Sequence, residues 1–115
     1  MLFIAYPKCS TCQKARKWLD EHNLEYIERQ IAEENPSYDE LKEWHRKSGL
    51  SLKKFFNTSG MLYKEMQLKD KLPLMSEEEQ LKLLATNGML VKRPVIVSED
   101  KVFTGFKETE WESLL

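Results

Sequence analysis

Two cysteines lie three residues apart near the N-terminus, in the segment Cys9-Ser10-Thr11-Cys12. Where a helix begins at such a pair, the two side chains lie one turn apart, close enough to form a disulfide. A thiol at a helix N-terminus also meets unpaired backbone N–H groups and the positive end of the helix dipole, which stabilise its thiolate. The spacing therefore predicts that Cys9 is the nucleophile and that Cys12, facing the core, attacks a mixed disulfide formed at Cys9.

Two other interpretations of this pair stay open, a structural zinc site and simple packing in the core. Structural zinc takes four ligands, and the only two histidines, His22 and His45, do not stand at ligand-like spacings. Free cysteines are also often buried as small apolar side chains. We favour a redox-active centre with a reversible Cys9–Cys12 disulfide bond, expect no metal, and place both histidines at surface or half-buried helix positions.

The residues around the cysteines indicate a β-α-β unit that would position them. Residues 2–6 form a short apolar run that ends at Pro7, which is typical of a buried strand. Ser10 and Gln13 have the spacing of a capping box, so a helix is predicted to begin near Ser10, and residues 24–31 suggest a second strand. A Cys-x-x-Cys between a strand and a helix is a much more specific signal than the motif alone.

The middle of the chain, from about 35 to 88, is predicted to be an all-helical insert. Two further capping boxes begin helices there, Ser37 with Glu40 and Ser76 with Glu79. Apolar side chains at helical spacing are interpreted as core rather than as a ligand site. They are Tyr38, Leu41, Trp44, Phe55 and Phe56.

The end of the chain returns to strands. Residues 95–97 and 102–104 predict a hairpin, and a last short helix follows over 107–115. Pro94 before the first of these strands is either a cis proline in a designed turn or only a strand opener. Arg93 beside it either binds an anion near Cys9 or is a solvated charge.

Composition sets the limits of function. The chain has 115 residues, 41% apolar and 32% charged, with a net charge of −1. This predicts one folded domain over 1–115 and no electrostatic attraction to nucleic acid or to an acidic membrane. It has no apolar run of about 20 residues, and the segment before Pro7 lacks a basic leader, so we expect no membrane association and a cytoplasmic location.

Three segments together resemble the arsenate reductase/Spx/MgsR family. They are residues 6–16, with the sequence YPKCSTCQKAR, residues 91–96, with VKRPVI, and residues 105–107, with GFK. The resemblance extends over nearly the whole chain. It implies a thioredoxin-like fold of the α/β class, with a mixed sheet and an all-helical insertion. It also implies a cis peptide bond at Pro94 facing the thiol, which makes Arg93 and Pro94 candidate anion- or substrate-binding residues.

The arsenate reductases of this family that use glutathione or glutaredoxin carry one catalytic cysteine, matching Cys9, and three arginines that bind the oxyanion. Arg93 matches one of them. No arginine occurs in the stretch 57–64, where the second is expected, and Gly105 stands where the third would fall. The resemblance therefore implies a thiol–disulfide oxidoreductase that is weak or inactive on arsenate. Its electron donor would be glutathione or a thioredoxin or glutaredoxin partner, with no tightly bound cofactor.

The Spx-type regulators of the same family carry a Cys-x-x-Cys redox switch at this place, matching Cys9 and Cys12. They bind the α subunit of RNA polymerase, so the alternative function is a redox-sensing regulator that binds the polymerase α C-terminal domain without contacting nucleic acid directly. The chain stops at Leu115 without the basic tail of the longer regulators. This favours the oxidoreductase, whose partner would be glutathione or a thiol or disulfide protein.

Overall fold

A computed structural model describes every residue from Met1 to Leu115. Its centre is a four-stranded sheet in the order β2-β1-β3-β4, made of β1 (Leu2–Ala5), β2 (Ile27–Gln30), β3 (Val95–Val97) and β4 (Val102–Thr104). β1 runs parallel to β2 and antiparallel to β3, and β3 runs antiparallel to β4. The mixed sheet confirms the predicted α/β class, and the β3–β4 hairpin lies where the sequence predicted it.

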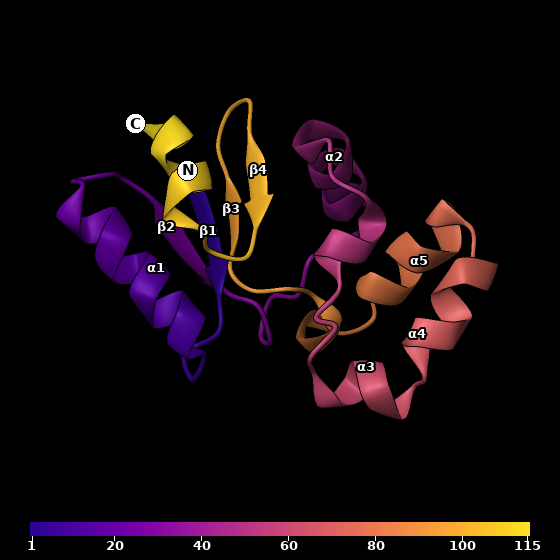
Figure 1. The fold of residues 1–115 in the computed structure, drawn as a ribbon. Coiled ribbons are helices and arrows are strands. Elements are labelled where there is room, and N and C mark those ends of the chain that lie inside the picture. The colour runs from indigo at the N-terminus through magenta and orange to yellow at the C-terminus, as the bar shows by residue number, and fades with distance from the viewer.

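The helices fall into two groups on either side of the sheet (Figure 1). α1 (Ser10–Glu21) joins β1 to β2, and α6 (Glu108–Trp111) with the 3-10 turn Glu112–Leu114 ends the chain. Every element between β2 and β3 is helical, as predicted. In order they are α2 (Tyr38–Ser48), η1 (Leu52–Phe55), α3 (Met61–Glu65), α4 (Leu68–Lys71), η2 (Leu72–Leu74), α5 (Glu77–Leu84) and η3 (Gly88–Leu90). None of these helices has the length and apolar character that crossing a membrane requires.

The alternation of side chains along the strands gives the sheet a separate core on each face. On β1, Phe3 and Ala5 pack toward α1 and α6, whereas Ile4 packs toward the helical insert. The α1 face holds eight buried residues, Cys12 among them, and the insert face holds sixteen. Most of the stripe predicted as core is buried on the insert face, where only Tyr38 is partly exposed.

Among the contacts that fasten the insert to the sheet, two lie near the ends of the insert. Arg29 at β2 forms a bidentate ion pair with Glu40 of α2, with Nη1–Oε2 and Nη2–Oε1 distances of 2.6 and 2.8 Å. Gly88, at the other end of the insert, lies so close to β2 that a Cβ atom there would come within 2.1 Å of the Ile31 carbonyl oxygen. A side chain at position 88 would therefore push the insert away from the sheet.

The predicted local structure needs two corrections, at the start of α1 and in the length of β2. The first residue of α1 is Ser10, and its N-cap is Cys9, so the capping box of Ser10 with Gln13 is wrong, whereas those that begin at Ser37 and Ser76 are confirmed. Within the insert, α3 and α4 are separate helices, because Gln67 between them adopts a left-handed conformation with φ of 53°. The strand suggested for 24–31 is confined to Ile27–Gln30.

Candidate functional site

Cys9 lies at the point where the chain leaves β1 and enters α1. Its backbone is extended, with φ −87° and ψ 117°, and its Sγ accepts a hydrogen bond from the Cys12 backbone N–H at 3.4 Å. The side-chain amide of Gln13 turns away from the N-cap and donates to the Pro7 carbonyl oxygen at 3.2 Å. The first turn of α1 carries no acidic residue that would compete for its N–H groups. The Cys9 sulfur is therefore the acceptor at this helix end.

The two thiols have opposite environments. Both cysteines are free, with Cys9 half-buried and Cys12 fully buried. Partial burial acts to raise the pKa of Cys9, but the Cys12 N–H and thiol and the nearby Arg93 guanidinium outweigh it, so the pKa lies below the ordinary thiol value. Burial raises the pKa of Cys12 to about 12. One thiol thus ionises more readily than an ordinary cysteine, while the other stays protonated.

Arg93 reaches Cys9 from the segment before β3. The Arg93–Pro94 peptide bond is cis, as the family resemblance implied, and Pro94 is buried. The Arg93 guanidinium lies over the Tyr6 ring, 5.3 Å from its centroid, and its Nη1 lies 3.7 Å from the Met89 sulfur. These two neighbours and the Cys9 thiol hold the guanidinium, which forms no ion pair with a carboxylate.

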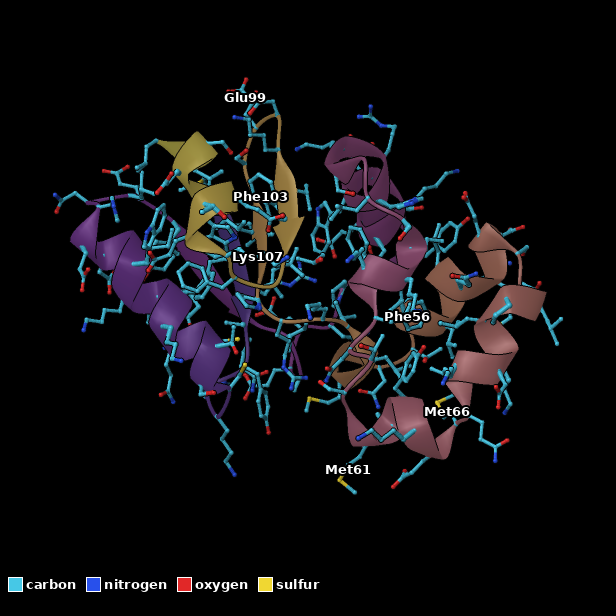
Figure 2. The ribbon with its side chains drawn as sticks, in the orientation of Figure 1. Phe56, Met61, Met66, Glu99, Phe103 and Lys107 are labelled. Atoms are coloured by element: carbon cyan, nitrogen blue, oxygen red, sulfur yellow. The ribbon has the colours of Figure 1, made fainter.

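Cys9 opens into a cavity of about 520 Å³. Besides Cys9, it is lined by Thr11, Asn57, Ser59, Gly60, Met61, Lys92, Arg93, Thr104, Gly105, Phe106 and Lys107. The lining includes three cationic side chains and no carboxylate, so it favours an anion at the Cys9 sulfur. Lys107 stands at the start of α6, and Met61 extends outward from α3 (Figure 2).

The structure places the predicted residues as follows. Cys9, Cys12 and Arg93 come together, and Pro94 lies behind Arg93 without lining the cavity. The stretch expected to supply an arginine does reach the cavity, through Asn57 and residues 59–61. No arginine other than Arg93 lines it.

The position expected to carry the third arginine is also in the cavity, and it suits glycine. Gly105 has a φ of +75°, and a Cβ atom there would lie 2.9 Å from Lys92 Cε. Its N–H donates to the Pro94 carbonyl oxygen at 2.8 Å. The backbone at this position therefore supports the segment after Arg93 rather than presenting a side chain to an anion.

Sequence reasoning missed the residues that surround Arg93 and much of the cavity lining. Tyr6 and Met89 were not singled out as its neighbours, nor was Lys92 as a cavity cation. The only available signal was that Tyr6 and Lys92 fall within the segments shared with the family. His22 lies exposed at the end of α1 and His45 is half-buried on α2. No three His, Cys, Asp or Glu side chains gather where they could hold a metal ion.

A thioredoxin-like sheet with a Cys-x-x-Cys at the start of its first helix, beside an Arg-Pro turn, defines the general class of this protein. The more particular assignment follows from comparison with known proteins. The model of the ArsC family matches residues 4–114, and the chain belongs to this family.

Relatives of known sequence or structure agree with the assignment. The chain is 59% identical over 112 residues to YusI of Bacillus subtilis (strain 168), an uncharacterized protein, covering 97% of this chain and 95% of YusI. A crystal structure of an ArsC-family-related protein from Bacteroides fragilis superimposes with a TM-score of 0.97 at 61% identity, covering 99% of this chain and 96% of that one. The global transcriptional regulator Spx of Listeria innocua is 34% identical over 105 residues, covering 90% of this chain and 78% of Spx.

Proposed function

We propose that this chain is a cytoplasmic thiol–disulfide oxidoreductase that uses Cys9 as nucleophile and Cys12 as resolving thiol. The observation that carries the proposal is the contrast between the two sulfurs. Cys9 opens into a cationic cavity, and the pKa of its thiol is lowered. Cys12 is buried, and the pKa of its thiol is raised to about 12. An attacking thiol needs exposure and thiolate character, and a resolving thiol needs only to reach the first sulfur.

In the proposed reaction the Cys9 thiolate bonds to one sulfur of a substrate disulfide, and the other sulfur leaves as a thiolate. Cys12 then loses its proton and attacks Cys9 Sγ, which breaks the mixed disulfide and forms the Cys9–Cys12 bond. The protein dithiol gives up two electrons and two protons, and the substrate disulfide becomes two thiols. Two molecules of glutathione, or a thioredoxin- or glutaredoxin-like dithiol, would return the protein to its reduced state.

Single-cysteine variants test this division of roles. With hydroxyethyl disulfide as substrate, Cys9→Ser should be inert, because the buried Cys12 cannot reach it. Cys12→Ser should form one stable mixed disulfide at Cys9, which intact-mass spectrometry would detect, but should not turn over. Full alkylation of both wild-type thiols after mild oxidation would contradict the proposal, as would equal alkylation rates of the two single thiols at pH 7.

We propose further that the protein is a poor arsenate reductase. Arg93 is the one guanidinium in the cavity, and lysines present point charges rather than the planar forks that hold several oxyanion oxygens. Each charge-assisted hydrogen bond contributes roughly 1.5–3 kcal/mol, so two missing arginines should cost about a thousandfold in catalytic efficiency. The assay is NADPH consumption with arsenate, coupled through glutathione and glutaredoxin or through thioredoxin. Turnover of about one per second at submillimolar arsenate would contradict the proposal of weak arsenate reduction.

A second function, redox-sensing regulation through RNA polymerase, is favoured by one observation. The chain is 34% identical over 105 residues to a protein named as the global transcriptional regulator Spx. Capture of purified polymerase α C-terminal domain by the reduced and oxidised protein would separate the two functions. Binding that changes with oxidation state, without turnover of small disulfides, would favour the regulator over the enzyme.

A further inference from the structure

The Cys9 cavity continues into a second hollow. This hollow, of about 330 Å³, is lined in part by Lys92, Thr104 and Lys107, which also line the cavity at Cys9. Beyond these shared residues it extends to Lys53 and Lys54 of η1. We call the hollow lined by Lys53, Lys54, Lys92 and Lys107 the basic groove. Lys107, labelled in Figure 2, lines both hollows.

The basic groove concentrates positive charge on a molecule that has little charge overall. The net charge of the chain is −1, yet Glu110 is the only acidic residue that lines either hollow. All four groove lysines are exposed, and none takes part in the five ion pairs of the structure. Unpaired cations on a shared concave surface attract an anionic partner and speed its association.

Two hydrogen bonds tie the backbones of Lys54 and Lys92 to the elements around the Cys9 cavity. The Lys92 backbone N–H donates to the Phe55 carbonyl at 2.9 Å, which ties η1 to the segment before Arg93. The Thr104 hydroxyl donates to the Lys54 carbonyl at 2.7 Å, which ties the same turn to β4. The backbones of Lys54 and Lys92 therefore belong to the framework that carries the cavity, rather than to a free loop.

We propose that the basic groove binds an acidic, extended polypeptide segment that flanks the disulfide presented to Cys9. The inference rests on the proposed oxidoreductase function and names its substrate class. The partner is a polypeptide because the lining is not only cationic. Leu50 and Phe56 line the groove, and Met61, 76% exposed, stands at the far edge of the cavity. Two joined hollows of about 520 and 330 Å³ also offer an extended chain more room than a single oxyanion would fill.

The chemistry in this complex is the two-step exchange described above. Cys9 bonds to one sulfur of the partner's disulfide, and Cys12 then displaces it. The partner gains two electrons and two protons from the dithiol, so no other reactant enters the step. Binding of Asp or Glu side chains along the groove would raise the local concentration of that disulfide at Cys9.

The test compares two disulfide peptides that differ only in their flanks, four Glu in one and four Lys in the other. We expect the reduced protein to react with the acidic peptide about tenfold faster at low ionic strength, and this advantage should fall as salt is added. The double variant Lys53→Glu/Lys54→Glu should lose or reverse the preference. Its rate with neutral hydroxyethyl disulfide should not change, because neither residue lines the Cys9 cavity.

A matched variant controls for net charge. Lys42 and Lys71 are exposed, unpaired and outside both hollows, so Lys42→Glu/Lys71→Glu changes the net charge equally and should keep the preference. Equal rates for the two peptides, or equal effects of the two double variants, would overturn the groove proposal while leaving the oxidoreductase intact. Failure to reduce even hydroxyethyl disulfide would instead overturn the proposed function, and this inference with it.

Discussion

The two faces of the sheet are built differently. On the α1 face, aromatic rings pack edge to face, with Trp111 against Phe3, Trp18 and Phe106 at centroid distances of 6.4, 5.9 and 4.8 Å. On the insert face the core is larger and mainly aliphatic, and short helices and 3-10 turns supply most of it. Directional ring contacts fix α1 against the strands, whereas the insert is held by many small contacts and a few anchors.

This difference separates the thiols from the groups that surround them. Both cysteines belong to the α1 face. Lys53 and Lys54 come from η1 in the insert, Lys92 and Arg93 from the segment that leaves the insert, and Lys107 from the start of α6. The Cys9 cavity forms where residues of the α1 face meet residues of the insert. A change in the insert can therefore alter what reaches Cys9 without moving Cys9 or Cys12. We infer that substrate choice in this fold resides in the insert and thiol chemistry in α1.

The largest expected effect comes from the aromatic cluster. Trp111 is fully buried, so Trp111→Ala should lower the free energy of unfolding by about 3–5 kcal/mol. Trp111→Phe should cost much less, because it keeps a ring and removes an indole N–H that has no hydrogen-bond partner. Urea unfolding followed by circular dichroism measures both.

The same measurement tests whether the two faces unfold together. Leu84 is fully buried on the insert face, so Leu84→Ala should lower the free energy of unfolding by about 2–5 kcal/mol. Because β1 supplies side chains to both cores, we expect one transition in each variant, as for a single domain over 1–115. An early transition confined to Leu84→Ala would show that the insert unfolds on its own.

The next effect concerns the anchor between β2 and α2. The Arg29 guanidinium, through its hydrogen bonds, lowers the pKa of Glu40 from 4.5 to about 2. A carboxyl whose pKa is lower in the folded state stabilises the fold above the unfolded pKa, and this stabilisation is lost as pH falls from about 4.5 toward 2. Since the Glu40 side chain is 35% exposed, solvent screening limits the contribution to about 1–2 kcal/mol.

Glu40→Gln should therefore destabilise the protein at pH 7 and approach the wild type only as the pH falls to about 2, as measured by urea unfolding at several pH values. Glu79→Gln is the matched control, because Glu79 closes the same kind of capping box with Ser76 but has no arginine partner. It should have the smaller effect. Equal losses in the two variants would assign the stability to the cap rather than to the anchor.

Local signals in the sequence were enough for most of the fold. The apolar run of β1, the caps at Ser37 and Ser76 and the final hairpin depend on neighbours close in the chain, and each was predicted correctly. The predicted N-cap of α1, Ser10, was wrong because serine is on average a better N-cap than cysteine. Here the chain places the Cys9 sulfur, not the Ser10 hydroxyl, where it can accept the Cys12 N–H.

The residues of the candidate site were recognisable in the sequence, but their surroundings were not. Cys9 and Cys12 are recognisable from spacing alone, and Arg93 from the family resemblance. The basic groove is made of lysines from η1, the segment before β3 and the segment before α6, and no local pattern indicates that they converge. The same holds for Tyr6 and Met89, which flank Arg93 only because β1 and η3 are brought together by the fold.

The smallest expected effect tests one of these neighbours. The Tyr6 ring holds the Arg93 guanidinium by a cation–π contact, which contributes about 0.5–1 kcal/mol at an exposed site. Arg93 helps to lower the pKa of Cys9, so a guanidinium that is less well held should let that pKa rise toward the ordinary value. The fraction of Cys9 present as thiolate at pH 7 then falls.

Tyr6→Leu should slow alkylation of Cys9 by iodoacetamide about twofold at pH 7, with little change once the thiol is fully ionised. Tyr6→Phe keeps the ring and should behave as the wild type, while Arg93→Ala should show the larger shift in the pH profile. Equal rates for Tyr6→Phe and Tyr6→Leu would mean that the ring packs beside Arg93 without positioning it.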